Sequence, residues 1–558
     1  MEERKTEGHI MRIAKLSVAL FVLGSAIVGA EESQLAKPTP VQYAWHEQER
    51  IMFVCLDPAT WQGGEYDNHT TKLSDMKLGK LDVDQWMAVA ESWGAKEILL
   101  VCKHTGGFCW WPTETTDYSV KNIAWKDGKG NLVKEVADAC RRHGLKMGVY
   151  IYPDDPRYSK GAGGGGRTGD PNKQEEWNRL LRKQWEEVLT MCGTDLVNEI
   201  WFDGNCIVPL TDILQLLAPN AVVLQSPVAS IRWVGNENGL AQDPNWNTVS
   251  GEKLRGGVTT ERHSTPDGDA WAPVECDTTL YIHNWFWSPQ KEKRRRSLPQ
   301  LMNIFTRSAG YGSVLLLNSS PNTNGVIPEG DVKCYREFGA MIDKQFGHPV
   351  AVVENKTGNT IELEIPAGKT VTCSDLWEDY RQGHRIRAYV IEGQVDGKWS
   401  ELRQGTAVGR RKLDFFEESR AAKVRVRVTE SVGIPLIRRW AVHLTDRELF
   451  QGNSRPETWE LAATINVKAG TQTVDVDLSK QVTTPRQYEI RVEGAGVKSA
   501  IPLFENQVGE QWFLEKIGWK GKFNLNRTQA VDKGSTTGIR LTFKTQKDVV
   551  VRVFVCPR

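Results

Sequence analysis

Short apolar segments alternate with amphipathic segments from about residue 45 to residue 345, and this alternation constrains the fold most strongly. The apolar segments are rich in Val, Ile and Leu, as expected of strands buried on both faces. They are 51–56, 97–102, 146–152, 197–202, 221–225 and 313–318, and segments of helical period lie at 83–93, 132–143, 174–192 and 298–308. Alternation over this length predicts an α/β fold, a (β/α)8-like TIM barrel.

The pattern changes after residue 345. Short β-branched segments separated by Gly, Asp and Asn turns predict C-terminal β-sandwich domains. We therefore expect a catalytic barrel in 31–345, a β-sandwich in 346–450 and a second β-rich domain in 451–558.

Residues 1–30 have the pattern of a signal peptide. Arg12 and Lys15 precede an apolar run at 16–28, and Val28-Gly29-Ala30 resembles a cleavage site. The run is short for a membrane span, although an uncleaved anchor is the alternative. We expect export to the periplasm or the cell exterior, with no membrane contact after cleavage.

The charge balance and the cysteine pattern limit the possible ligands. Lys plus Arg number 71 and Asp plus Glu 70, which leaves no field of one sign to attract nucleic acid. The ten cysteines form neither a C-x-x-C pair nor a zinc-like Cys/His cluster, so we interpret them mainly as buried small side chains. No metal and no cofactor are expected. The 21 tryptophans suit sugar binding as well as an ordinary core.

Asp203 ends the apolar segment 197–202 and precedes Gly204. In a barrel the active site lies at the carboxyl ends of the strands, so Asp203 is a candidate nucleophile of a retaining glycosidase. The alternative is an ordinary turn aspartate.

A retaining glycosidase also needs a second carboxyl that acts as general acid and base. Glu237 lies in a loop with Trp233 and flanking glycines, where desolvation can raise the pKa of a carboxyl. Glu261, Glu275 and Asp277 compete for this role, because they also lie downstream of the 221–225 segment.

Aromatic and histidine side chains follow several predicted strands. His104 comes directly after the second strand, Trp111 lies shortly beyond it, Tyr150 ends the third, and Trp285 lies in a late loop. These positions suit a sugar site at the mouth of the barrel, although each aromatic side chain could instead be packing.

Residues 42–345 resemble glycoside hydrolase family 29, the retaining α-L-fucosidases. The similar segments are 103–111, 116–120, 132–150, 200–204, 232–239, 274–277, 285–289 and 314–318 with Pro321. The segments 232–239, 274–277 and 285–289 are similar to the subgroup that acts on branched α-1,3/1,4-linked fucosides.

The resemblance implies that Asp203 is the nucleophile and Glu237 the general acid/base. The substrate-binding residues that we expect are Glu65, Tyr66, His104, Trp111, Tyr150 and Trp285. The implied reaction removes terminal α-L-fucosyl residues from oligosaccharides, polysaccharides or glycoconjugates by double displacement.

The sequence departs from the family pattern at Cys55, Tyr66 and Thr105, where the family has His, Trp and His. Losing a hydrogen-bonding partner can change sugar specificity strongly. Two alternatives therefore stay open: the same mechanism on a related sugar such as α-L-galactose, and a non-catalytic carbohydrate-binding barrel. The oligomeric state does not follow from the sequence.

Overall fold

The computed structural model describes residues 35–446, 449, 460–480, 487–493, 497–504, 522–526 and 536–557. The chain divides into two compact units, Met1–Leu449 and Phe450–Arg558, each of which we describe by itself. The predicted signal peptide lies outside the described residues. No described helix has the length and apolar character needed to cross a bilayer.

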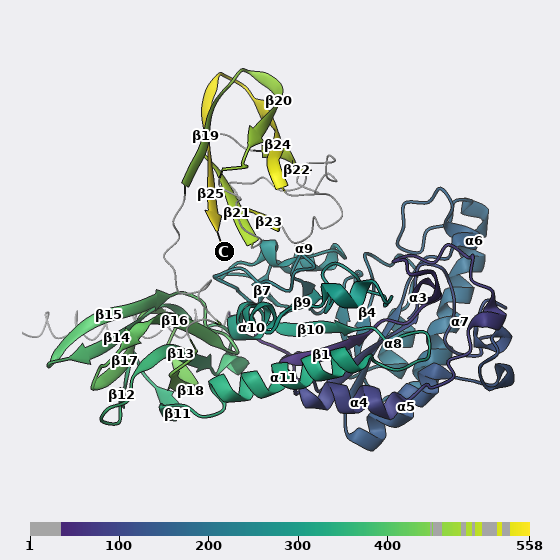
Figure 1. Ribbon diagram of the computed structural model, residues 1–558, viewed down its shortest axis with the longest axis horizontal. Coiled ribbons are helices and arrows are strands. Elements are labelled where there is room, and N and C mark those ends of the chain that lie inside the picture. Colours follow the sequence, from purple (N-terminus) through teal and green to yellow (C-terminus); the bar gives the residue numbers. More distant parts are fainter. Residues whose placement is uncertain are drawn as a thin grey trace, which may run out of the picture. The chain divides into compact units, whose positions relative to one another are not determined.

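Eight parallel strands form the barrel in the first unit (Figure 1). They are β1 (Arg50–Val54), β2 (Glu97–Lys103), β3 (Lys146–Ile151), β4 (Val197–Trp201), β5 (Val222–Leu224), β6 (Arg232–Trp233), β9 (Val274–Thr278) and β10 (Val314–Ser319). Each pairs with its neighbour in this order except β5 and β6, which are the two edges of the sheet, and β1 pairs with β10. A parallel bridge between Leu224 and Ile231 nearly closes the ring. The predicted barrel is confirmed.

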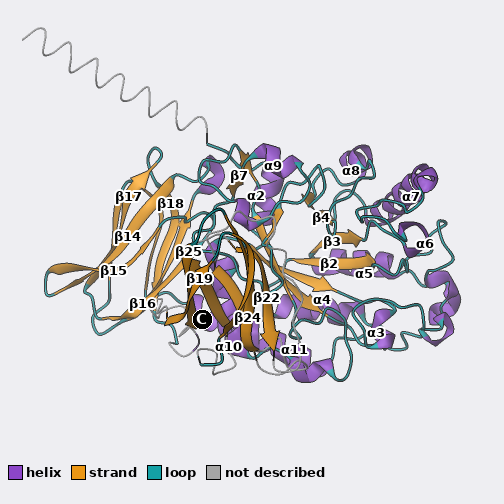
Figure 2. Cartoon of the chain, turned by 90° about the horizontal axis from the view of Figure 1, so that it is seen from above, coloured by secondary structure: helices purple, strands orange, loops and turns teal. Residues whose placement is uncertain are grey.

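Helices surround these strands (Figure 2). The longer ones are α4 (Val83–Ser92), α5 (Leu132–His143), α7 (Gln174–Cys192), α8 (Thr211–Leu217), α10 (Leu298–Arg307) and α11 (Glu329–Phe346). The Asp82 and Asn131 side chains accept hydrogen bonds from backbone N–H groups in the first turns of α4 and α5. Gly144 ends α5 in the left-handed region, at φ 67°.

The sequence analysis missed β6 and β9, because β6 has two residues and β9 carries two acids, Glu275 and Asp277. Shorter elements complete the unit: α3 (Ala59–Gln62), α6 (Pro156–Ser159), α9 (Gly251–Arg255), β7 (Thr248–Val249) and β8 (Ala270–Trp271).

Helix α2 (Pro40–His46) precedes β1, and its side chains enter the barrel. Trp45 is fully buried and packs among the side chains that fill the barrel interior. The Gln42 amide donates to the carbonyls of Ser230 and Trp271, each at 2.7 Å. We infer that α2 covers the end where the barrel strands begin.

Two four-stranded antiparallel sheets follow the barrel within the first unit. Their strands are β11 (Ala351–Thr357), β12 (Thr360–Glu364), β13 (Val371–Glu378), β14 (Ile386–Val395), β15 (Lys398–Gly405), β16 (Lys412–Ser419), β17 (Lys423–Ser431) and β18 (Leu436–His443). The sheet orders are β11-β18-β13-β16 and β12-β17-β14-β15. Their buried side chains, with Trp440 among them, form one apolar core between the two sheets.

The second unit is also built from antiparallel strands. They are β19 (Glu460–Val467), β20 (Gly470–Asp477), β21 (Gln487–Glu493), β22 (Val497–Phe504), β23 (Lys522–Asn526), β24 (Thr536–Thr545) and β25 (Val549–Pro557). They form sheets in the orders β19-β25-β21-β23 and β20-β24-β22. The antiparallel β-structure predicted after the barrel is confirmed, whereas the domain boundaries stay a prediction.

Candidate active site

Asp203 lies two residues beyond β4, at the carboxyl end of that strand. Tyr150, from β3, donates a hydrogen bond from Oη to Asp203 Oδ2 over 3.0 Å. Burial of the surroundings raises the pKa of Asp203, the Tyr150 hydrogen bond opposes this rise, and nearby Asp154 adds to it. The Asp203 side chain still reaches solvent, so it is accessible to a ligand.

Glu237 lies four residues beyond β6, and its side chain is also exposed to solvent. Burial of the surroundings raises its pKa, and the Trp285 indole donates a hydrogen bond to its carboxylate. The negative charges of Asp203 and Glu65 raise the pKa of Glu237 further. Asp203 therefore lies close enough to Glu237 for its negative charge to disfavour ionisation of Glu237.

Glu65 anchors the loop that carries Trp285. Its carboxylate accepts hydrogen bonds from the Trp285 backbone N–H at 2.7 Å and the Asn284 amide at 3.0 Å, and it forms an ion pair with Lys291. The Trp285 carbonyl accepts a hydrogen bond from the Ser320 hydroxyl at 2.6 Å. We infer that Glu65 orients the Trp285 indole beside Glu237.

His104 lies in an aromatic wall. Its ring is parallel to Tyr66 at 6.2 Å, lies 6.0 Å from Tyr150, and meets Phe286 edge-on at 4.8 Å. Burial lowers the pKa of His104 to about 4, so the ring is neutral at neutral pH. Tyr66 is 71% exposed, which leaves much of this side chain open at the rim.

Trp111 does not join this group. Its indole is 1% exposed and donates a hydrogen bond to Glu187 of α7 at 2.7 Å. The expected sugar contact is therefore replaced by packing of the segment after β2 against α7.

The rival acids are all buried beside structural partners. Glu261 accepts from the Gln242 backbone N–H, Glu275 accepts from Trp201, and Asp277 accepts from Trp233. Each has a raised pKa because of burial. Glu237 is the candidate that reaches solvent.

The departures from the family pattern lie close to these groups. Cys55 is buried and hydrogen-bonds to Asn318, and its thiol pKa is raised by burial and by the charges of Glu65, Asp57 and Asp203. The Thr105 hydroxyl lies 3.2 Å from His104 Nδ1.

Sequence reasoning missed Asp154 and Lys291. Asp154 lies just beyond β3, a strand-end position that could have identified it. Lys291 pairs with a residue 226 positions away, which no local pattern indicates.

The cysteines whose side chains are described have free thiols; eight of the nine are buried, and Cys334 is half-buried. This confirms their interpretation as packing residues.

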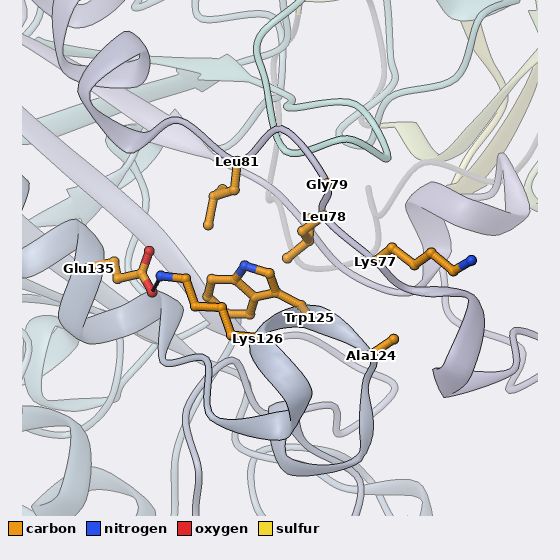
Figure 3. A pocket seen from close by; sticks show the side chains of 8 residues that line it. All are labelled: Lys77, Leu78, Gly79, Leu81, Ala124, Trp125, Lys126 and Glu135. Carbon is orange, nitrogen blue, oxygen red and sulfur yellow. Dashed lines mark hydrogen bonds and ion pairs between the residues drawn. The ribbon is translucent and has the colours of Figure 1, made fainter.

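A hollow of about 360 Å³ elsewhere on the unit shares no residue with this group (Figure 3). It is lined by Lys77, Leu78, Gly79, Leu81, Ala124, Trp125, Lys126 and Glu135. Lys126 lies 5.1 Å from the Trp125 ring and pairs with Glu135, the only carboxylate in this lining. The hollow therefore lacks the two carboxyls that glycoside hydrolysis needs.

Comparisons with known proteins identify the family of this chain. A family model described as α-L-fucosidase matches residues 46–345. Alpha-L-fucosidase 1 of Arabidopsis thaliana is 27% identical over 473 residues, which cover 76% of this chain and 90% of that protein. The crystal structure of a candidate α-L-fucosidase from Bacteroides thetaiotaomicron is 28% identical, with a TM-score of 0.67, and the match covers 74% of this chain and all of that one.

A Ruminococcus gnavus GH29 fucosidase solved in complex with fucose shares the fold, at 22% identity and a TM-score of 0.66. That match covers 74% of this chain and 96% of the other. The family match spans more than half of this chain and includes the strands that precede Asp203 and Glu237. The chain therefore belongs to the α-L-fucosidase family, glycoside hydrolase family 29, and is a glycosidase that hydrolyses terminal α-L-fucosyl residues.

Proposed function

We propose that the enzyme works by double displacement, with Asp203 as the nucleophile and Glu237 as the general acid/base. The observation that carries this proposal is the electrostatic coupling of two solvent-accessible carboxyls beyond β4 and β6. Their partners differ in a way that suits the two roles: a phenol contacts Asp203, and an indole contacts Glu237.

In the first step an Asp203 carboxylate oxygen bonds to C1 of the sugar, and the bond from C1 to the leaving oxygen breaks. Glu237 gives its proton to that oxygen. In the second step Glu237 takes a proton from water, the water oxygen bonds to C1, and Asp203 leaves as a carboxylate. Once Asp203 is a neutral ester, its charge no longer raises the pKa of Glu237, so Glu237 becomes the base that this step requires.

We also propose branched oligosaccharides or glycoconjugates with α-1,3- or α-1,4-linked fucose as the substrates. The support is the resemblance of 232–239, 274–277 and 285–289 to that subgroup, together with exposed Tyr66 beside the site. Hydrolysis of a branched α-1,3-linked trisaccharide should be faster than that of an α-1,2-linked disaccharide. A preference for the α-1,2 linkage would contradict this assignment. Export to the periplasm or cell exterior is proposed from the pattern of residues 1–30 alone.

The stereochemistry of azide products tests the two catalytic roles separately. With an activated aryl α-L-fucoside, Asp203→Gly should lose almost all activity and regain turnover in azide, giving β-fucosyl azide by a single inversion. Glu237→Ala should give α-fucosyl azide, because azide then attacks the glycosyl-enzyme. Full activity in either variant without azide, or exchanged product configurations, would overturn the assignment.

A further inference from the structure

Three glutamates lie fully buried inside the barrel. Glu97 lies on β2, Glu199 on β4 and Glu275 on β9, and each is 0% exposed. The mechanism above uses none of them. A carboxylate in an apolar interior is costly unless it is neutralised or hydrogen-bonded, so these side chains need an explanation.

Glu199 and Glu275 hydrogen-bond to each other. Two ionised carboxylates offer acceptors only, so this contact requires a proton on one of them. Among the described residues, no N–H or hydroxyl group donates to Glu199 Oε1 or Glu275 Oε1, which leaves these two oxygens for the shared proton. Burial raises the pKa of both groups, consistent with a pair that keeps a proton at neutral pH.

Each acid also accepts a hydrogen bond from an indole. Trp45, on α2, donates to Glu199 Oε2 at 2.8 Å, and Trp201, on β4, donates to Glu275 Oε2 at 2.7 Å. The pair therefore joins the helix that covers one end of the barrel to a tryptophan two residues before Asp203.

Trp201 extends this connection to the active site. Its ring stacks on Tyr150 at 5.3 Å with an interplanar angle of 26°. Tyr150 in turn donates its hydroxyl hydrogen to Asp203. Trp45, Glu199, Glu275, Trp201 and Tyr150 form a continuous set of contacts that ends on Asp203, which we call the interior column.

We propose that Glu275, paired with Glu199 through a shared proton, is a positioning residue that holds Trp201 and thereby fixes Tyr150 against Asp203. This inference rests on the proposed role of Asp203. Glu199 donates the shared proton to Glu275, and the remaining Glu275 oxygen accepts from the Trp201 indole. Glu275 touches no reacting atom and acts through its two aromatic neighbours.

The column also affects the ionisation of Asp203. The Tyr150 hydrogen bond favours the charged form of Asp203, so a loosely held Tyr150 leaves that carboxylate with a higher pKa. Glu97, from β2, raises the pKa of both members of the pair, and Glu275 in turn raises the pKa of Asp277, two residues along β9. All are acids, so they favour retention of the proton.

The test compares Glu275→Leu with Glu97→Leu, the same change at another fully buried glutamate in the barrel. Glu97 accepts hydrogen bonds from Gln48 and Asn198; it acts on the pair through its charge alone, and within the described residues no hydrogen bond joins it to Trp201 or Tyr150. Glu275→Leu should lower kcat on an aryl α-L-fucoside by about 10- to 100-fold with little change in KM, because a small misplacement of a reacting group is costly. In Glu275→Leu the acid limb of the pH profile of kcat/KM should also move to higher pH. Folded Glu97→Leu should keep the wild-type kcat and the wild-type acid limb.

Glu275→Gln supplies the rescue. Its amide oxygen can accept from Trp201 and its amide N–H can donate to Glu199, so kcat should stay within about threefold of wild type. Should Glu275→Leu fail to fold, Trp201→Phe removes the indole donor and should also move the acid limb to higher pH.

Equal effects of the two leucine variants on kcat would overturn the positioning role. A wild-type kcat and acid limb in Glu275→Leu would also do so, as would a wild-type acid limb in Trp201→Phe. Asp203→Gly with azide is measured alongside. If azide rescues Asp203→Gly and Glu275→Leu is unaffected, only the positioning role of the interior column is overturned. If azide does not rescue Asp203→Gly, the assignment of Asp203 as the nucleophile is overturned.

Discussion

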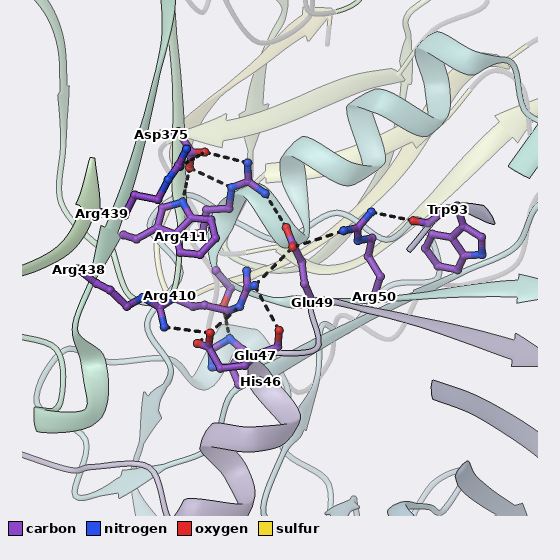
Figure 4. A network of polar contacts seen from close by, with 12 residues as sticks. His46, Glu47, Glu49, Arg50, Trp93, Asp375, Arg410, Arg411, Arg438 and Arg439 are labelled. Carbon is purple, nitrogen blue, oxygen red and sulfur yellow. Dashed lines mark hydrogen bonds and ion pairs between the residues drawn. The ribbon is translucent and has the colours of Figure 1, made fainter. Parts of the chain in front are cut away.

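Buried carboxylates occur just before the first barrel strand and inside the barrel, but they are neutralised in opposite ways. Before β1, Glu49 faces Arg410, Arg411 and Arg50, and these cations lower its pKa to about 2 (Figure 4). Inside the barrel, Glu199 and Glu275 share a proton and have raised pKa values. Burial disfavours charge at both places, so the presence or absence of a cation decides which form survives.

The arginine-rich end joins the barrel to the first pair of antiparallel sheets. Arg411 donates two hydrogen bonds to Asp375 at 3.0 and 2.9 Å and a third to Glu49 at 2.6 Å. Arg438 pairs with Glu47 at 2.9 Å. The structure therefore has a cluster of acids paired with arginines where the two parts of the unit meet (Figure 4).

The end that carries the active site needs the opposite property. A general acid must keep its proton near neutral pH, and a nucleophile must be free to bond with the sugar. Within the described residues, no lysine or arginine is among the groups that shift the pKa of Asp203 or Glu237. Lys291, the lysine in the site, pairs with Glu65 instead, and we infer that keeping cations off the two catalytic carboxyls is part of how this barrel supports its chemistry.

The largest effect on stability is expected from Arg411→Met. The change leaves Glu49 and Asp375 buried without the one arginine that hydrogen-bonds to both, and breaking such a pair costs about 3–5 kcal/mol. Urea unfolding at pH 7 should show this loss in the free energy of unfolding.

Arg381→Met is the matched control, because Arg381 pairs with Asp379 at the surface, where the arginine is 60% exposed. Exposed pairs contribute about 0–1 kcal/mol. Similar losses in both variants would mean that the buried cluster has no special role.

A smaller effect on stability, which depends on pH, is expected from Glu97→Gln. Burial raises the pKa of Glu97 to about 7, so the folded state holds a proton that the unfolded chain releases above its ordinary pKa of 4.5. This contribution is complete below pH 4.5 and is lost as the pH rises to 7. At 1.36 kcal/mol per pKa unit this rise corresponds to a loss of roughly 3 kcal/mol, and the glutamine variant should not show it.

Urea unfolding at pH 4.5 and pH 8 measures this difference. Wild type should lose more stability than Glu97→Gln between the two values. An equal change in both proteins would show that Glu97 does not hold a proton in the folded state.

Much of the fold followed from local sequence, because long buried strands and capped helices have strong periodic patterns. The strands β6 and β9 escaped detection, since one is very short and the other carries Glu275 and Asp277. Trp111 was assigned to the sugar site from its position after β2. Its contact with Glu187 of α7 joins residues 76 positions apart, so the local sequence does not indicate it.

The candidate site was partly accessible to the same reasoning. Asp203 follows a strand end, and the resemblance distinguished Glu237 from its rivals. Family membership favours α-L-fucose over the α-L-galactose alternative and an enzyme over a non-catalytic barrel. The anchoring of Trp285 by Glu65 joins residues 220 positions apart, and no local pattern indicates it.

Trapping of the glycosyl-enzyme tests the central claim most directly. A 2-deoxy-2-fluoro fucosyl fluoride forms the intermediate quickly and releases it slowly, because fluorine disfavours the oxocarbenium-like transition state. Digestion and mass spectrometry should find the fluorosugar on the peptide that contains Asp203, with fragmentation assigning it to that carboxylate. A label on Glu65, Asp154 or Glu237, or turnover with no labelled peptide, would contradict the account.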